Sequence, residues 1–252
     1  MSVIFRSILK PNGDMMVADS KIKYGLSESH LRTYQRADCA VFKSTHAQWG
    51  GFSNMAAGFP IVVAGVEFRT SEALYQCCRY PHLPEVQAKI LDQGSPMTAK
   101  MVGKPYRSET RPNWDYLRVT FMRWALHQKL LHNWDRFGDL LLQSEGLDIV
   151  EESIKDCFWG AQPGEFDQLV GFNVLGRLLM DLRQNLIDRP ESLLILEPPQ
   201  VDHFLFFGNE ANSIMLADEV LYERIGKKWE LMDTSTKEVA EAKTDDGLQL
   251  FA

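Results

Sequence analysis

The 252-residue chain carries 34 acidic against 27 basic side chains, for a formal net charge of −7, and 45% of its residues are hydrophobic. This composition is typical of a globular protein with one elaborated domain, or with one domain and a small second one. The acidic balance excludes a generally basic nucleic-acid coat but permits a local basic pocket. The sequence shows neither a signal-peptide pattern nor an apolar run of membrane-spanning length, so we expect a cytoplasmic protein without a membrane partner.

The beginning of the chain predicts short elements. Residues 1–20 place two apolar stretches around P-N-G, a strong hairpin turn signal. Residues 27–36 predict a short helix, and residues 39–42 predict a short apolar strand.

The middle of the chain predicts mostly helices. A β-branched stretch over residues 60–68 predicts a hairpin that turns at Ala64 and Gly65. Capping residues and prolines predict helices over residues 70–80, 84–94, 95–103, 112–134 and 135–144. A strand over residues 147–150, a turn at 156–160 and a loop to residue 171 follow. Leucines at helical spacing then predict an amphipathic helix over residues 173–187.

The E-P-P stretch at residues 197–199 indicates a boundary. Beyond it the sequence predicts strands over residues 201–207 and 228–232, a helix over residues 213–224 between them, and a polar stretch over residues 233–247. Helices outnumber strands and do not alternate with them as βαβ units, which favours an α+β fold.

Glu72 is the first candidate catalytic residue. It falls in the first turn of the helix over residues 70–80, where the helix dipole favours negative charge. An ionised carboxylate there could stabilise positive charge on a sugar ring or activate a water molecule. The alternative is a routine first-turn glutamate that only suits the dipole.

The long helix over residues 112–134 carries a second set of candidates. Trp114, Arg118, Met122, Ala125 and Lys129 share one face of it by their spacing. Such a face could stack a base and hold phosphates, or it could be a solvated basic edge beside the core face.

A basic stretch precedes this helix and contains Lys100, Lys104, Arg107 and Arg111. In an acidic protein this local excess predicts a phosphate-binding rim, with a solvated charged loop as the alternative.

Three later residues have two interpretations each. Asp156 could bind a ribose or orient water, or it could satisfy the backbone in an Asx turn. Asn173 could cap its helix, whose start could also receive a phosphate. Gly176 weakens a helix interior, which indicates close approach by a ligand or by neighbouring backbone.

The histidines and cysteines show no metal-ligand spacing, and the sequence has no P-loop, G-x-G-x-x-G or G-x-S-x-G motif. We therefore expect no metal site and no cofactor.

Seven motifs in order resemble the NADAR superfamily, which is named for its association with NAD and ADP-ribose and includes riboflavin-biosynthesis-intermediate N-glycosidases. They are G-F-S-N-M at residues 51–55, T-S-E-A-L-Y-Q at 70–76, S-P-M-T-A-K-M-V-G at 95–103, N-W at 113–114, M-R-W-A-L-H-Q-K at 122–129, L-D-I-V-E-E-S with D-C-F-W-G within 147–160, and N-V-L-G-R-L-L-M-D-L-R at 173–183. The resemblance implies a compact, mainly helical α+β catalytic core over residues 40–188. Residues 1–39 and 189–252 are then small N- and C-terminal extensions.

The resemblance implies cleavage of an N-glycosidic bond at the C1 of a phosphorylated ribose. Glu72 matches the family's S-E-H carboxylate, and Lys129 matches a basic residue that would stabilise the opened sugar or attack its C1 to form an imine. Asp156 completes the catalytic candidates. The substrate-binding candidates are Phe52, Ser53, Asn54, Arg69, Lys104, Arg107, Trp114, Arg118, Trp159, Gly160, Asn173 and Gly176.

This chain departs from the family pattern at three places. Ala73 replaces the usual histidine after the glutamate, and Arg79 replaces the usual lysine of the Q-A-x-K stretch. The loop between Trp159 and Asn173 is long and acidic, whereas relatives are often rich in glycine and lysine there. We expect these changes to alter which substrate fits.

The expected function is removal of ADP-ribose from a modified nucleobase. Guanine in DNA is favoured, because some family members reverse that modification as antitoxins. The alternatives are an N-glycosidase acting on phosphoribosylamino-pyrimidine riboflavin intermediates, and a non-catalytic module that binds ADP-ribose or NAD derivatives. The expected partners are an ADP-ribose-containing substrate, ADP-ribosylated DNA and a cognate ADP-ribosyltransferase toxin.

Overall fold

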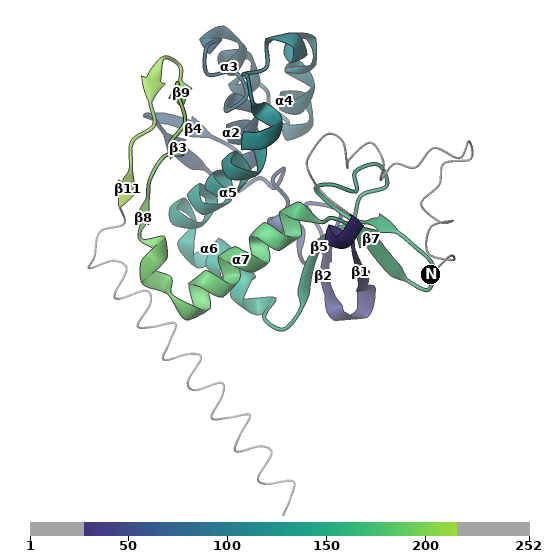
Figure 1. Ribbon diagram of the computed structural model, residues 1–252. Coiled ribbons are helices and arrows are strands. Elements are labelled where there is room, and N and C mark those ends of the chain that lie inside the picture. The colour runs from purple at the N-terminus through teal and green to yellow at the C-terminus, as the bar shows by residue number, and fades with distance from the viewer. Residues whose placement is uncertain (1–27, 216–252) are drawn as a thin grey trace, which may run out of the picture. The chain divides into compact units, whose positions relative to one another are not determined.

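The computed structural model describes residues 28–215 (Figure 1). One unit of the chain extends to Ser213, and a second begins at Ile214 with the short strand β11 (Ile214–Met215). The predicted hairpin at residues 1–20, the strand at 228–232 and the polar stretch at 233–247 lie outside the described residues. The helix predicted over residues 213–224 is wrong where it is described, because residues 214–215 are a strand.

An antiparallel three-stranded sheet corrects two predictions. It has the order β1 (Arg32–Gln35), β7 (Gln168–Gly171), β6 (Gln162–Pro163), and in the part of the chain that the structure describes β1 is preceded by the short 3-10 turn η1 (Glu28–His30). The helix predicted over residues 27–36 is therefore wrong, as is the uninterrupted loop up to residue 171. Distant pairing decided the outcome: Tyr34 pairs with Leu169 and packs against Val150 and Ala161 in a small buried cluster.

Two further strand pairs lie in the core domain. The predicted strands β2 (Cys39–Phe42) and β5 (Asp148–Glu151) are confirmed, and they pair in parallel across more than a hundred residues. The predicted hairpin is confirmed as β3 (Ile61–Val63) and β4 (Val66–Phe68). Ala64 and Gly65 both have positive φ, of 51° and 75°, as a tight two-residue hairpin turn requires.

The predicted helices are present with slightly shifted ends. They are α2 (Ser71–Cys77), α3 (Pro84–Leu91), α4 (Pro96–Val102), α5 (Trp114–His132), α6 (Trp134–Gln143) and α7 (Val174–Asp188), with 3-10 turns η2 (Arg36–Asp38), η3 (Gly50–Phe52), η4 (Lys104–Glu109) and η5 (Pro190–Leu193). Thr70 caps α2 as predicted, because its hydroxyl accepts a hydrogen bond from the Ala73 N–H at 3.3 Å. No helix in the described part of the chain combines the length and apolar character needed to cross a membrane.

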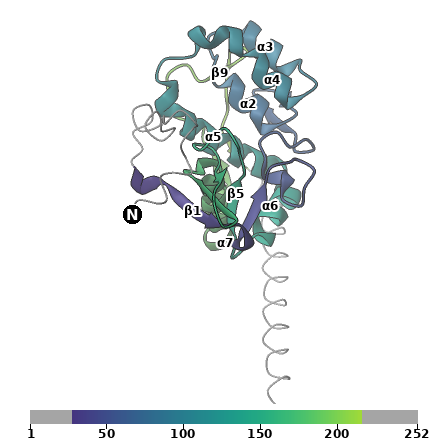
Figure 2. The same ribbon diagram turned by 90° about the vertical axis from the view of Figure 1, so that its right-hand side faces the viewer.

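In this unit α2, α3 and α4 gather at one end, strands β1, β2, β5 and β7 lie at the other, and α5 runs between them (Figures 1 and 2). Helix α5 buries Phe121, Ala125 and Leu130 completely, which makes it the centre of the core. Helix α7 packs on β5 at Gly176, where a Cβ atom would lie 2.0 Å from the carbonyl oxygen of Ile149. Of the two interpretations of this glycine, close approach by neighbouring backbone is confirmed.

Residues beyond α7 pack back onto the core. Strands β8 (Ile195–Leu196), β9 (Leu205–Phe206) and β10 (Asn209–Glu210) are very short, so the longer strand predicted over residues 201–207 is wrong except at its end. Phe204 stacks on Phe121 with ring centres 5.4 Å apart, and Phe204 and Phe206 both contact Trp124. These aromatic contacts hold the C-terminal extension against α5.

Candidate functional site

Three side chains of α2, those of Glu72, Tyr75 and Gln76, share one helix face by their spacing, and Arg79 follows in the turn after the helix ends at Cys77. The Glu72 side chain is held firmly: its residue is only 5% exposed, and Gln76 donates a hydrogen bond to its Oε1 at 2.9 Å. The main-chain N–H of Glu72 donates to the carbonyl oxygen of Asn54 at 3.0 Å. Both the main chain and the side chain of Glu72 are thereby fixed.

Asn54 ties the G-F-S-N loop to two helices. Its Oδ1 accepts a hydrogen bond from the Ser71 hydroxyl at 3.1 Å, and its Nδ2 donates to the sulfur of Met122 on α5 at 2.8 Å. Asn54 is only 5% exposed, and its hydrogen bonds hold the G-F-S-N loop against the start of α2. The Ser53 hydroxyl also serves the loop, since it accepts a hydrogen bond from the N–H of Met55.

Lys129 lies beneath the same loop. Its Nζ donates hydrogen bonds to the carbonyl oxygens of Gly51 at 2.6 Å and Ser53 at 3.0 Å, and it lies 4.5 Å and 4.4 Å from the ring centres of Phe59 and Phe137. The residue is completely buried, and burial lowers the pKa of its amine to about 7. The solvated basic edge considered for this face of α5 is wrong, because Arg118 is also buried.

Glu151 is a candidate that the sequence analysis missed. It ends strand β5, and burial raises the pKa of its carboxyl to about 7, with further contributions from the negative charges of Asp156 and Glu72 and an opposing one from Lys100. The charges of Glu72 and Asp156 therefore lie close enough to Glu151 to favour its protonated form. The available signal was its position in the V-E-E-S motif, at the end of a buried strand.

Asp156 adopts the Asx-turn geometry, and that interpretation is confirmed. Its Oδ1 accepts hydrogen bonds from the N–H groups of Phe158 and Trp159, both at 2.9 Å. These bonds fix the turn that carries the Trp159 ring.

Aromatic rings connect the carboxyl groups to α5. Tyr75 contacts Trp159 edge-on with ring centres 5.8 Å apart, and contacts Trp114 at 5.1 Å. Burial raises the pKa of Tyr75; the charge of Glu72 adds to this shift, and those of Arg79 and Arg118 oppose it. Tyr75 thus lies within electrostatic reach of the carboxylate and of both guanidinium groups.

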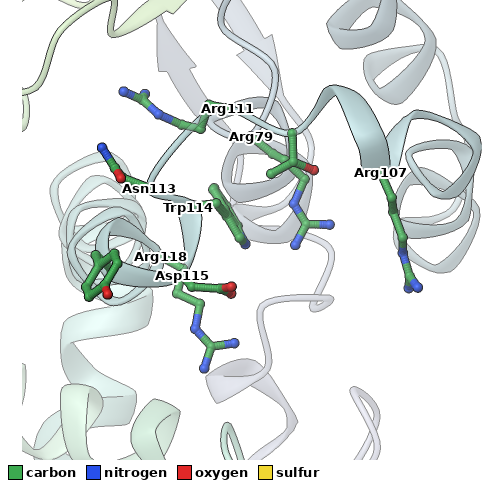
Figure 3. Close-up of a pocket in the computed structure, with 9 residues that line it drawn as sticks. Arg79, Arg107, Arg111, Asn113, Trp114, Asp115 and Arg118 are labelled. Atoms are coloured by element: carbon green, nitrogen blue, oxygen red, sulfur yellow. The ribbon is translucent and has the colours of Figure 1, made fainter. Parts of the chain in front are cut away.

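Beside Trp114 lies a cavity of about 560 Å³ that we call the arginine cleft (Figure 3). Its lining residues are Arg79, Arg107, Thr110, Arg111, Asn113, Trp114, Asp115, Tyr116 and Arg118. In Figure 3 the side chains of Arg79 and Trp114 run alongside each other, while Arg111 is directed away from them. The Cζ of Arg79 lies 4.5 Å from the Trp114 ring centre, and that of Arg118 lies 3.6 Å from the Phe158 ring centre. Stacked guanidinium groups of this kind suit recognition of phosphate.

The remaining candidates lie elsewhere. Phe52 is completely buried between Trp49 and Phe137, so its ring packs in the core. Arg69 is exposed and lines a separate cavity of about 20 Å³ near the end of α3. Lys104 is exposed on η4 and does not line the arginine cleft, unlike Arg107.

Asn173, Gly160 and Gly176 serve backbone packing. The Asn173 side chain does not cap α7: its Nδ2 donates to the Ile149 carbonyl at 2.8 Å, and its Oδ1 accepts from the N–H of Glu151 at 3.2 Å. A Cβ atom at Gly160 would lie 2.5 Å from the carbonyl oxygen of Glu151. These residues therefore fix the end of β5 that carries Glu151. Within residues 28–215, no three His, Cys, Asp or Glu side chains converge to hold a metal ion.

Several known proteins are similar to this chain. The N-glycosidase YbiA of Escherichia coli (strain K12) is 34% identical over 145 residues, which cover 58% of this chain and 86% of that protein. The riboflavin biosynthesis protein VVA0006 of Vibrio vulnificus is 32% identical over 126 residues, half of this chain and 33% of that one. An NMR structure of E. coli YbiA superposes with a TM-score of 0.51 at 32% identity, covering 64% of this chain and 94% of that chain.

The sequence model of the NADAR domain matches residues 41–187, which span more than half of the chain. The matched stretch contains Glu72, Glu151, Asp156 and the whole lining of the arginine cleft. The chain belongs to the NADAR domain family.

Proposed function

We propose that this protein is an N-glycosidase that releases a nucleobase from the C1 of a phosphorylated ribose, and that its substrate is ADP-ribosylated guanine in DNA. The observation that carries the proposal is the short passage from Glu72 to Arg79: Glu72 lies at the start of α2, and Arg79, in the turn that follows the end of α2 at Cys77, lines the arginine cleft. Relatives that are covered over 86% of their length are named N-glycosidases, which supports cleavage of an N-glycosyl bond.

The chemistry assigns complementary roles to two carboxyl groups. As the bond between C1 and the base nitrogen breaks, positive charge develops on the ribose, and the Glu72 carboxylate stabilises it. Glu151, protonated below a pKa of about 7, donates its proton to the departing nitrogen. Water adds its hydroxyl to C1, and its proton returns to the carboxyl pair. A preorganised charge of this kind typically lowers the barrier by about 3 kcal/mol.

The arginine cleft would hold the phosphates of the substrate. Four arginines line it against one aspartate, which gives a strong local positive charge in a chain of net charge −7. Guanidinium groups bind phosphate oxygens with two parallel hydrogen bonds, so they orient the sugar as well as attract it. Trp114 and Trp159 would shape the pocket for the ribose and the base.

Lys129 enters this mechanism as a positioning residue. Its amine is occupied by two carbonyl oxygens of the loop that meets Glu72 through Asn54. In this arrangement it orders the loop, whereas an imine with the sugar would need the amine to leave both carbonyls.

The choice of substrate is tested by measuring base release from two compounds. Purified protein is incubated with a DNA oligonucleotide that carries ADP-ribosylated guanine, and separately with a phosphoribosylamino-pyrimidine. The proposal is supported if the wild-type protein removes ADP-ribose from the DNA and the Glu72→Gln variant does not. Base release from the phosphoribosylamino-pyrimidine alone supports the alternative function, an N-glycosidase acting on riboflavin intermediates. The riboflavin-biosynthesis names of two relatives favour that alternative. Binding of ADP-ribose by calorimetry, without release from either compound, indicates a non-catalytic module.

The antitoxin role requires a separate experiment. We propose that a cognate ADP-ribosyltransferase toxin modifies the DNA that this protein repairs. Cells that express such a toxin should survive when the wild-type chain is present and die when Glu72→Gln replaces it. Equal survival with both proteins would indicate neutralisation by binding instead of by repair.

A further inference from the structure

Residues 200–203 close a second cavity beside the arginine cleft, which we call the strap cavity. Its volume is about 820 Å³, and its lining residues are Pro81, His82, Arg111, Pro112, Asn113, Tyr116, Leu117, Gln200, Val201, Asp202 and His203. The NADAR match ends at residue 187, so the four residues at 200–203 come from the extension of this chain. The cavity is therefore a feature that the extension adds to the family domain.

The two cavities meet at shared residues. Arg111, Asn113 and Tyr116 line both of them. The Nη2 of Arg111 donates a hydrogen bond to the carbonyl oxygen of Asp202 at 2.9 Å, which fixes its guanidinium group against the extension. A ligand that extends from one cavity into the other must pass these residues.

Arg111 has donors that the described residues do not use. It is 8% exposed, and in residues 28–215 its Nε and Nη1 atoms are buried without a hydrogen-bond partner. Burial of an unpaired guanidinium nitrogen is costly, so such donors point to a ligand with acceptor oxygens. The Arg111 Cζ lies 5.0 Å from the Phe121 ring centre, so a phosphate at the junction of the two cavities would satisfy these donors once the guanidinium group turns from that ring toward it.

The strap cavity differs from the arginine cleft in chemistry. It combines apolar side chains such as Leu117 and Val201 with three rings that can stack, those of His82, Tyr116 and His203. The Tyr116 residue is 86% exposed, so its ring is available to a ligand. The positive charge of Arg111 is balanced by the negative charge of Asp202, so this cavity has little net charge apart from its histidines. It suits a neutral, flat and partly polar group.

We propose that the strap cavity binds the distal nucleoside of a dinucleotide substrate, whose pyrophosphate passes Arg111 and whose other ribose reaches Glu72. The nucleobase stacks on the rings of Tyr116 and His203, and Asp202 or Gln200 accepts hydrogen bonds from the ribose hydroxyls. This inference rests on the proposed function and specifies its substrate class. A phosphoribosyl compound ends at its phosphate and leaves the strap cavity empty, so the extension selects a dinucleotide.

The test compares the binding of two probes to the full chain by calorimetry. ADP-ribose fills both cavities, and ribose 5-phosphate reaches only the arginine cleft. Val201→Trp adds a bulky ring to the lining of the strap cavity, and His203→Asn removes a ring while keeping a residue that tolerates the positive φ of 53° at this position. Loss of one stacking contact corresponds to about a 10-fold change in affinity. We expect each variant to bind ADP-ribose about 10-fold more weakly or worse, and ribose 5-phosphate as the wild type does.

Two matched variants complete the experiment. Ile195→Trp adds the same ring at an exposed position of the extension that lines neither cavity, and it should bind both probes normally. Arg107→Ala changes the arginine cleft alone and should weaken the binding of both probes. A thermal melt of each variant identifies any that is unfolded.

Three results would overturn the inference: no binding of ADP-ribose, equal affinity of the wild type for both probes, or unchanged ADP-ribose affinity in folded Val201→Trp and His203→Asn. None of these measurements requires catalysis. A protein that binds ADP-ribose through the strap cavity but releases no base would keep the inference and contradict the proposed function. A protein that removes ADP-ribose from guanine in DNA equally well as wild type and as Val201→Trp would do the reverse.

Discussion

Gln76 donates a 2.9 Å hydrogen bond to Oε1 of Glu72, one helical turn earlier on α2. The second carboxylate oxygen takes no part in this bond, so it can serve the substrate. A carboxylate that is fixed before the substrate arrives needs no reorganisation in the transition state, which is where electrostatic catalysis gains most.

Replacing Glu72 by glutamine should remove activity without unfolding the protein. The amide oxygen of glutamine can still accept the hydrogen bond from Gln76, while the negative charge that stabilises the ribose is lost. We expect kcat to fall at least about 100-fold with an unchanged melting temperature. Normal turnover by a folded Glu72→Gln protein would exclude Glu72 from the mechanism.

Activity should fall as pH rises through about 7. The pKa of Glu151 is raised from its ordinary value of 4.5 to about 7, so its proton is available below that pH and lost above it. We expect kcat/KM to decline above pH 7 and Glu151→Gln to lack this decline, with activity reduced about 100-fold. A wild-type profile that stays flat from pH 6 to 8.5 would contradict the role of Glu151 as proton donor.

The same carboxyl should affect stability with a definite sign. The folded protein binds more protons than the unfolded chain between pH 4.5 and about 7, so the free energy of unfolding should decrease as pH rises through this window. Urea unfolding at several pH values measures the slope, which Glu151→Gln should reduce. The exposed Glu191 provides a control, because Glu191→Gln should leave the slope intact.

Lys129→Met should destabilise the loop that leads to Glu72. Methionine leaves the carbonyl oxygens of Gly51 and Ser53 without their donor, at a cost of about 2–4 kcal/mol in the free energy of unfolding. The lowered pKa of Lys129 makes wild-type stability rise with pH between about 7 and 10.5, because the unfolded chain binds more protons there, and the variant should lose this rise. The exposed Lys155→Met is the control, with little change expected.

An imine at Lys129 can be sought directly. Borohydride reduces an imine to a stable amine, which mass spectrometry of the peptide detects. Because the Lys129 amine is fully buried on two carbonyl oxygens, we expect no sugar adduct on it during turnover. A substrate-dependent adduct at Lys129 would restore its role as nucleophile.

Gly176→Ala should strongly destabilise the protein, whereas Gly94→Ala should not. The new methyl group at position 176 would lie 2.0 Å from the Ile149 carbonyl oxygen, so α7 must move away from β5, which we expect to cost about 3 kcal/mol. Position 94 has no heavy atom within 4 Å of the added carbon. Urea unfolding of both variants measures the difference, and equal stability of the two would show that the contact relaxes freely.

Local signals predicted the helices and the Thr70 cap of α2 because those depend on neighbours in the chain. Thr70 caps α2 through a residue three positions on, and Pro84 and Pro96 open helices whatever lies around them. Strand β6 was missed because it has only two residues and one of them is a proline. Strands β1 and β7 were missed because they pair with each other across more than 130 residues of the chain. A sequence window does not contain that pairing.

The sequence by itself determined the family motifs, the helical content, the position of Glu72 at a helix start and the basic stretch before α5. Only the tertiary structure decided which charges meet. It buried the Lys129 amine under a loop, brought Glu151 to the carboxyl groups of Glu72 and Asp156, and separated Arg69 and Lys104 from the arginine cleft. The physical reason is that burial and electrostatic interaction depend on distance in space, and packing sets that distance between segments far apart in the chain.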